Sequence, residues 1–372
     1  MTMKSYLPRR NRARVPATGL SLVCFATVLF GQPPTLNSAL KLNQIQIIGT
    51  HNSYHAGLTV EESAFIRKTD RVEADALDYR HQSLTSQLDA GMRELEIDIN
   101  ADPTGGSFDR PRIQTELAAA GVPDAPFPYP KEMMDRPGFK VMHKARTDFR
   151  SNCQPFTACL EEIAQWSDRH QGHVPIYLFI EAKDGSKFTA GDSDELDEEI
   201  RSVFPRQKLF VPEDLLKGHA TLRQAVADHG WPELEAVRGK VIFLMSRADV
   251  TKAYESGHPG LKGRILFTNG PLDDPNTAYA VVPDPHDKEI PQLVRSGYLV
   301  YTRADADTAE ARTKDETRQK AAFASGAQII STDYPTSEPS PWSGYTVAFP
   351  GHVVARCNPV NTVQPCSLTS PK

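Results

Sequence analysis

Short apolar runs alternate with longer amphipathic stretches along most of the chain. Eight runs have the length and the β-branched, apolar content of buried strands. They cover residues 45–48, 94–100, 140–143, 176–181, 241–245, 265–267, 298–301 and 328–331. This alternation is typical of repeated βα units, in which helices cover a parallel sheet. We therefore expect an α/β fold with eight parallel strands.

The amphipathic stretches between these runs predict helices over residues 84–90, 157–170, 194–203, 222–229 and 308–325. Three of them are followed by glycine, at Gly91, Gly230 and Gly326. Glycine is the usual residue just past a helix because it adopts left-handed backbone conformations. Residues 101–137 hold many Pro, Gly and Asp residues and no sustained period, so we expect a long loop there.

Two folds are compatible with eight βα units, a closed barrel and an open doubly wound sheet. Polar residues cluster where the predicted strands end, which is where barrel enzymes carry their functional side chains. They are His51, Asn52, His143, Lys144, Glu181, Lys183, Arg303 and Asp333. We therefore predict a (β/α)₈ TIM barrel over residues 40–340, with a tail, 341–372, that packs on its outside.

Glu96 and Asp98 stand two residues apart in the second run. Side chains alternate between the faces of a strand, so both carboxylates point the same way. Two acids on one buried face repel each other and cost stability unless a cation neutralises them. Calcium suits such a site, and Asn52 and Glu181 would complete an all-oxygen ligand set, although magnesium stays open. On an exposed edge strand, Glu94, Glu96 and Asp98 would simply face solvent.

Two of the strand-end residues are histidines, His51 and His143, which we place on neighbouring strands. Histidine exchanges protons readily near neutral pH. Two imidazoles beside a metal suggest phosphoester cleavage, with one ring stabilising the phosphoryl oxygens and the other protonating the leaving oxygen. A single His-Asn pair after a strand is more often a capped turn, but these residue types recur at successive strand ends. The candidates for substrate binding are Lys144, Lys183, Arg303 and Asp333.

The first residues have the order of a secretory signal peptide. Arginines at positions 9, 10, 12 and 14 precede an apolar run at 20–30, as signal peptides require. The run is too short to span a membrane comfortably. We expect residues 1–39 to be a signal peptide with a short leader and the mature protein to be secreted, extracellular or periplasmic. A retained anchor or a misassigned start is the alternative.

The cysteines agree with export. Removal of Cys24 with the leader leaves Cys153, Cys159, Cys357 and Cys366, an even set in two close pairs. Local pairing within each pair is the simplest arrangement, although the sequence does not fix the connectivity. Zinc binding is the weaker interpretation, because there is no Cys-x-x-Cys motif and exported thiols usually oxidise.

The formal net charge of −5 gives no general attraction to nucleic acid or to an anionic membrane. An anionic substrate must therefore be met by local cations or a bound metal. We expect no nucleic-acid partner, and no protein partner is evident from the sequence.

Together the motifs resemble the catalytic barrel of phosphatidylinositol-specific phospholipases C. They are Gly49-Thr-His-Asn-Ser-Tyr54, Gly91-x-Arg93-x-x-Glu96-x-Asp98, a histidine ending the third run and a glutamate ending the fourth. The metal-using branch is most similar, over about residues 43–335. The resemblance implies that His51 and His143 are the catalytic pair and that Asn52, Glu96, Asp98 and Glu181 hold Ca²⁺. It also implies a phosphatidylinositol-type lipid substrate at a membrane surface. In that family the inositol 2-hydroxyl attacks phosphorus, which releases diacylglycerol and leaves a cyclic inositol phosphate.

Residues 180–184 differ from the Glu-Asn-His of the large eukaryotic signalling enzymes, and no flanking pleckstrin, EF-hand or C2 modules are expected. Residues 326–335 are similar to the last barrel strand of glycerophosphodiester phosphodiesterases, which carry His-Arg-Gly where this chain has His51-Asn52-Ser53. A glycerophosphodiesterase or a phospholipase D of the same barrel superfamily is therefore the first alternative. A non-catalytic protein that binds lipid headgroups is the second, but it would need no proton donor on the leaving-group side.

Overall fold

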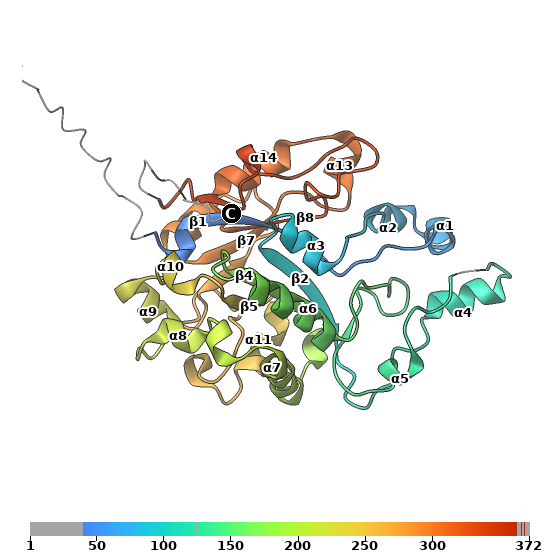
Figure 1. Ribbon diagram of the computed structural model, residues 1–372, viewed down its shortest axis with the longest axis horizontal. Coiled ribbons are helices and arrows are strands. Elements are labelled where there is room, and N and C mark those ends of the chain that lie inside the picture. The colour runs from blue at the N-terminus through green and yellow to red at the C-terminus, as the bar shows by residue number, and fades with distance from the viewer. Residues whose placement is uncertain (1–39, 124, 363–365, 367, 369–372) are drawn as a thin grey trace, which may run out of the picture. The chain divides into compact units, whose positions relative to one another are not determined.

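The computed structural model describes residues 40–123, 125–362, 366 and 368. The chain divides into a first unit that ends at Thr35 and a second that begins at Leu36, and the description below concerns the second (Figure 1). The expected signal peptide, residues 1–39, lies outside the described residues. Among the helices that are described, none combines the length and the apolar character needed to cross a membrane.

The second unit contains nine strands and fourteen α-helices among the described residues. The strands are β1 Ile45–Thr50, β2 Glu94–Asn100, β3 Lys140–Val141, β4 Ile176–Ala182, β5 Val241–Met245, β6 Tyr279–Val281, β7 Leu299–Arg303, β8 Ile329–Thr332 and β9 Ala355–Cys357. The helices are α1 Val60–Thr69, α2 Arg71–Ala76, α3 Leu84–Asp89, α4 Arg112–Ala119, α5 Lys131–Met134, α6 Phe156–Arg169, α7 Ala190–Val203, α8 Pro212–Leu216, α9 Leu222–His229, α10 Leu234–Val237, α11 Thr251–Glu255, α12 Ile290–Arg295, α13 Ala309–Thr313 and α14 Thr317–Ser325.

Seven of the strands form a curled sheet in the order β5-β4-β2-β1-β8-β7-β6, and each neighbouring pair is parallel. The predicted strand at 265–267 extends the sheet beyond β5, because Phe267 pairs in parallel with Leu244. Among the described residues no strand pairing joins this segment to β6, so the barrel has an unbonded seam there. The predicted TIM-type α/β barrel is confirmed.

Helices cover the sheet from outside. Figure 1 shows α6, α7, α8, α9 and α11 on one side of the strands and α13 and α14 on the other. In β2, Leu95, Ile97 and Ile99 alternate with the acids and share one apolar cluster with Leu160 and Ile163 of α6. Full burial of such side chains contributes about 1.5–3 kcal/mol each. The apolar face of β2 is therefore anchored on the helical layer, which turns its acidic face to the barrel interior.

Two strand predictions are wrong. The third run forms the short strand β3, which is antiparallel to the end of β2 and does not belong to the barrel wall. β4 pairs directly with β2, so His143 does not follow a barrel strand next to that of His51. The wall strand that the prediction lacks is β6, only three residues long and set in a segment rich in Pro and Asp. Such a short run gives little periodic signal.

The helix predictions hold for residues 84–90, 157–170 and 222–229 within one residue at each end, and α7 begins four residues earlier than expected. Thr189 and Asp192 form a capping box that starts α7 there, a signal readable in the sequence. The predicted helix at 308–325 is two helices, because Lys314 adopts a left-handed conformation between α13 and α14. The segment 101–137 is not a plain loop, since it contains α4 and α5.

The tail returns to the barrel through β9, which pairs antiparallel with β1 from Ile45 to Ile47. The disulfide Cys357–Cys366 closes a short loop directly after β9, and Cys153–Cys159 joins the start of α6 to the segment before it. The two local pairings were the simplest arrangement on sequence grounds, and both are present.

Candidate active site

An acidic cluster lies at the carboxyl ends of β2 and β4. Glu96, Asp98 and Glu181 each offer a carboxylate oxygen within 4.8 Å of the others. Asp98 pairs in register with Glu181, which brings the acids of the two strands together. All seven residues of β2 are buried between β1 and β4, so the exposed edge strand considered above is excluded. The expected face-sharing of Glu96 and Asp98 is confirmed.

Burial makes this cluster costly to ionise. It raises the pKa of Glu96 well above the usual value, and repulsion from Asp98 and Glu181 adds to the effect. Burial also raises the pKa of Asp98, to about 6. For Glu181 burial acts in the same direction, but the nearby Lys183 ammonium outweighs it and the pKa falls below its usual value. A cation placed among the three acids would reverse the first two shifts.

The cluster fits a hard divalent cation. Asp98 is fully buried and forms an ion pair with Lys183, but within the described part of the chain neither of its carboxylate oxygens accepts a hydrogen bond of good geometry. The Lys183 Nζ lies 3.0 Å from Asp98 Oδ2 and 3.1 Å from Glu181 Oε1. This ammonium marks a position where cationic charge is favoured. A set of carboxylate oxygens with free lone pairs is what calcium requires.

Asn52 adjoins the cluster from the turn after β1. It is a non-glycine residue with φ of 47°, a conformation that Asn tolerates better than most residues. Its amide Nδ2 donates to the Tyr79 hydroxyl at 2.8 Å, and its Oδ1 accepts from the Tyr54 hydroxyl at 3.3 Å. The amide is thereby fixed in a fully buried position. Gly49 lets β1 approach closely, since a Cβ there would lie 2.3 Å from Glu94.

His51, also in this turn, contacts a buried aspartate. Its Nδ1 lies 2.8 Å from Asp333 Oδ1, at the end of β8, while Arg303 donates to Asp333 Oδ2 at 2.8 Å. Burial and the Arg303 charge lower the pKa of His51 to about 4, although Asp333 opposes them. With Nδ1 held by Asp333, the other ring nitrogen of His51, Nε2, makes no hydrogen bond among the described residues.

His143 makes a similar contact with Asp148, a residue that sequence reasoning missed. His143 Nδ1 lies 2.8 Å from Asp148 Oδ2. The same carboxylate contacts Nε2 of the buried His55 at 2.9 and 3.0 Å. The charges and hydrogen bonds of these two histidines outweigh burial and lower the pKa of Asp148. Asp148 is thus ionised between two imidazoles. Its side chain reaches them through a turn after β3 that carries no sequence motif, so only its place five residues after His143 hinted at the contact.

The His51–Asp333 pair and the His143–Asp148 pair border the same acidic cluster. His51 influences the pKa of Glu181, and His143 influences that of Asp98. The Tyr79 ring packs between the two pairs. Its centroid lies 6.1 Å from that of His51 and 4.6 Å from that of His55, which shares Asp148 with His143. The structure therefore brings the two expected histidines together, although by a different route from the one that the sequence suggested.

The four candidates for substrate binding are all engaged in ion pairs. Lys183 contacts the acidic cluster, and Arg303 contacts Asp333. Lys144 bonds Glu73 in α2. Asp333 is buried, with both carboxylate oxygens occupied. Asp333 thus contacts His51 and Arg303 and does not face the solvent.

Comparisons with known proteins agree with this arrangement. The model of a family described as phosphoinositide phospholipase C, Ca²⁺-dependent, matches residues 40–359. A comparison with curated protein sequences finds no match.

Solved structures share the fold. A calcium-dependent phosphoinositol-specific phospholipase C from a Gram-negative Pseudomonas sp. is 17% identical, with a TM-score of 0.54 over 86% of this chain and 95% of that one. Its myoinositol complex gives the same identity and TM-score, over 86% and 96% of the two chains. The Ca²⁺-dependent enzyme from Streptomyces antibioticus is 20% identical, with a TM-score of 0.53 over 79% and 95%.

The family match covers most of the chain and includes every residue of the acidic cluster and both histidine pairs. It confirms the expected enzyme class, a phosphoric diester hydrolase, and the expected cofactor, calcium. The chain belongs to the Ca²⁺-dependent phosphoinositide phospholipase C family.

Proposed function

We propose that the protein cleaves the glycerol-side phosphodiester of phosphatidylinositol, giving diacylglycerol and a cyclic inositol phosphate. The observation that carries this proposal is the pair of histidine–aspartate contacts on either side of one acidic cluster. Two imidazoles and a bound cation are the groups that an attack by a neighbouring hydroxyl on phosphorus needs. A solved structure with the same fold contains myo-inositol, which supports an inositol headgroup.

In this proposal Glu96, Asp98 and Glu181 hold calcium, together with the Oδ1 of Asn52. Bound calcium would lower the pKa of the attacking 2-hydroxyl and offset the charge of the phosphoryl oxygens. The cluster is buried and converges from two strands, so the ligands are held in place before the substrate arrives. Such preorganisation is where most of the catalytic benefit of a charged site originates.

We assign different roles to the two histidines. Asp148 holds Nδ1 of His143 at 2.8 Å, which leaves its Nε2 to protonate the leaving glycerol oxygen. His51 would contact the phosphoryl oxygens through Nε2, because Asp333 holds its Nδ1. The anionic phosphate would supply the negative charge that a proton on His51 requires. Asp333 and Asp148 are positioning residues in this scheme, since each orients one imidazole.

The cations near the site would receive the anionic headgroup. Arg303 and Lys183 adjoin the histidines and the acids, and we propose that they contact the phosphate or the inositol hydroxyls. Lys144, bonded to Glu73, would act from the rim of the site. No particular phosphorylated inositol is assigned, because residues 180–184 depart from the eukaryotic pattern.

We further propose that the protein works outside the cytoplasm, with residues 1–39 as the signal peptide, 40–340 as the catalytic unit and 341–372 as a tail on the barrel. Two disulfides support this proposal, because such bonds persist in oxidising compartments. Protein sequencing of the secreted form from its amino terminus tests it.

The decisive experiment compares phosphatidylinositol with its 2-deoxy analogue under identical calcium concentrations, with phosphorus NMR to follow the products. Intramolecular attack gains its rate from proximity, so loss of the 2-hydroxyl should abolish turnover while binding persists. A cyclic phosphate should appear before any acyclic product. Equal rates on both lipids, or efficient hydrolysis of glycerophosphocholine, would contradict the proposal and favour a glycerophosphodiesterase.

A further inference from the structure

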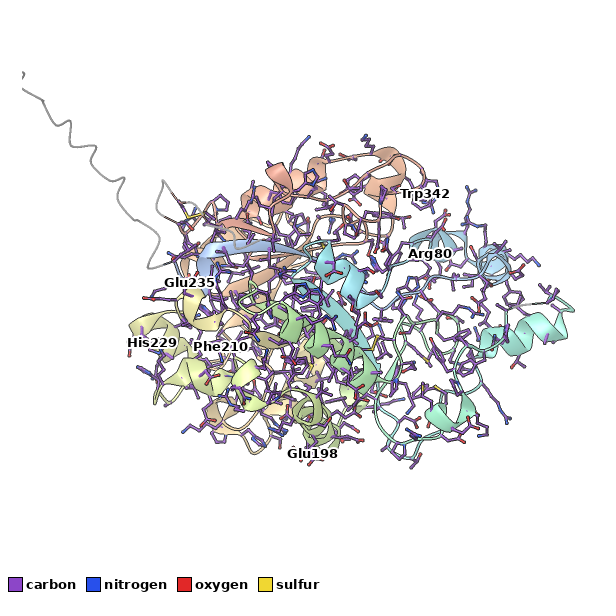
Figure 2. All side chains as sticks on the ribbon, in the orientation of Figure 1. Arg80, Glu198, Phe210, His229, Glu235 and Trp342 are labelled. Atoms are coloured by element: carbon purple, nitrogen blue, oxygen red, sulfur yellow. A yellow bond between two sulfur atoms is a disulfide. The ribbon has the colours of Figure 1, made fainter. Side chains whose placement is uncertain are left out.

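A cavity lined by several arginines lies at the amino ends of the strands, away from the acidic cluster at their carboxyl ends. It has a volume of about 430 Å³ and is lined by residues that directly precede strands, among them Arg93 before β2, His173 and Val174 before β4 and Arg238 before β5. The end of α6 contributes Arg169. Figure 2 labels Glu235, the ion-pair partner of Arg238, at the end opposite Arg80 and Trp342.

Arg93 is the most unusual residue of this cavity. It is 92% buried, since only 8% of its surface is exposed. Its Nη1 donates to the carbonyls of Leu88 and Met92 at 3.0 and 2.7 Å, and its guanidinium lies over the Trp166 ring at 4.9 Å. Nε, however, has no hydrogen-bond partner among the described residues. No described carboxylate lies within ion-pair distance of Arg93, and Asp89, the nearest acid in electrostatic terms, bonds the Trp166 indole at 2.7 Å.

Three arginines and one acid, Asp89, line the cavity, which therefore has an excess of positive charge. Arg169 is exposed and makes no ion pair within the described part of the chain, whereas Arg238 is paired with Glu235 at 2.7 Å. A buried guanidinium without an acid is costly, and burial lowers the pKa of Arg93 to about 10. At neutral pH the group nevertheless remains charged. An anion in the cavity would supply the missing charge and accept the free N–H.

The walls indicate what kind of anion fits. Leu88, Trp166, Val354 and Leu368 give the cavity apolar lining beside its guanidinium groups, and of these Val354 and Leu368 are the partly exposed ones. Guanidinium forks match phosphate oxygens, and a phosphate alone is smaller than this volume. We propose that this cavity binds a small phosphomonoester, with the phosphate on Arg93 and Arg169 and the organic part against Val354 and Leu368. This site is separate from the active site and does not depend on the proposed reaction.

Calorimetric titration of the full chain in chelator tests this site with phenyl phosphate, inorganic phosphate and phenol as probes. Phenyl phosphate should bind more tightly than inorganic phosphate, because it also fills the apolar wall, and phenol should not bind measurably. Arg169→Gln should weaken binding of phenyl phosphate about 10-fold, the contribution of one charge-assisted hydrogen bond. Arg93→Lys, which keeps the charge but loses the fork, should weaken it as well.

Two controls make the result specific. Arg295→Gln removes an exposed arginine outside the cavity, and His51→Asn alters the active site, so both should leave the affinity for phenyl phosphate unchanged. Absence of heat at millimolar probe, an equal loss in Arg295→Gln, or a loss confined to His51→Asn would overturn the proposal. Glycerol 3-phosphate and dihexanoyl phosphatidic acid then distinguish a soluble ligand from a lipid headgroup, and tighter binding of either identifies the source.

Discussion

At the carboxyl ends of the strands, His51 and His143 each place Nδ1 on a buried aspartate. At the amino ends, His173 instead contacts only neutral oxygens, with Nδ1 2.7 Å from the Val174 carbonyl and Nε2 2.8 Å from the Ser167 hydroxyl. The same side chain therefore has two electrostatic settings in one barrel. A carboxylate partner orients a ring and raises its pKa, but burial still lowers the pKa of His51 to about 4, as it does for His173, so the two settings differ in their partners rather than in proton affinity.

The distribution of charge follows the same division. Three acids gather at the carboxyl ends of the strands, where Lys183 pairs with two of them, and the Arg93 guanidinium lies at the amino ends with no ion pair among the described residues. A parallel sheet places all its strand ends of one kind at one edge, so each end can acquire its own chemistry. The predictions below test whether these two ends are as different as their contacts indicate.

The largest effect is expected from the paired histidines. His51→Ala and His143→Ala should each lower kcat at least about 10²-fold, the usual contribution of a positioned acid or base. Turnover of phosphatidylinositol is the measurement, with thermal unfolding as the check on folding. The exposed His286 provides the control, and His286→Ala should retain full activity. A loss of stability that accounts for the loss of activity would make both histidines structural.

The second effect concerns calcium. Asp98→Asn should weaken calcium binding about 10-fold or more, because it removes one negative ligand, while the barrel stays folded. Glu94→Gln, four residues earlier on the same face of β2, is the matched control. Burial raises the pKa of Glu94 to about 8, so this carboxyl is mostly neutral at pH 7. The Glu94→Gln variant should therefore bind calcium like the wild type. Equal calcium affinity in both variants, measured by calorimetry, would exclude Asp98 as a ligand.

A smaller change is expected at Lys183, whose ammonium contacts two of the acids. Lys183→Met should tighten calcium binding by about 3- to 10-fold, on the order of 1 kcal/mol, because the ion no longer displaces a partly exposed ion pair. The melting temperature without calcium should fall, and the increase on adding calcium should grow. Lys187→Met, at an exposed site nearby, should change neither quantity. Weaker calcium binding in Lys183→Met would show that the ammonium and the ion do not compete.

The last prediction concerns His173, whose effect on stability is absent at neutral pH and develops only as the pH falls. Burial lowers the pKa of His173 to about 4, against 6.5 for the exposed group. Between pH 6.5 and pH 4, His173 is therefore mostly protonated in the unfolded chain and mostly neutral in the folded chain. The contribution of His173 is therefore complete above pH 6.5 and is lost as the pH falls towards 4, at about 1.4 kcal/mol per pH unit.

Urea unfolding at several pH values checks this slope. His173→Gln should flatten the fall in the free energy of unfolding between pH 6.5 and 4 relative to the wild type, whereas His286→Gln should not. Identical pH profiles of the wild type and His173→Gln would show that burial does not hold the pKa of His173 down.

The sequence predicted the site best where a local rule applied. Alternation along a strand brought Glu96 and Asp98 to one face, and the strand-end rule identified His51, Asn52 and Glu181. It did not reveal Asp148, because its contacts with His143 and His55 arise from a turn whose course depends on tertiary packing. The β3 segment was read as a barrel strand for a related reason, since an apolar run does not show which partner it will pair with.

The site residues come from two parts of the chain, and one of these parts contains the antiparallel strand β3. His51, the acids and Asp333 belong to the barrel wall or its immediate ends, whereas His143 and Asp148 belong to the long connection between β2 and β4. β3 pairs this connection with the end of β2, and the connection ends at the Cys153–Cys159 bridge. Asp148 also contacts His55 in the turn after β1, so this connection and the barrel wall share one aspartate. An exchange of residues 101–155 between related barrels would therefore have to preserve that contact together with His143.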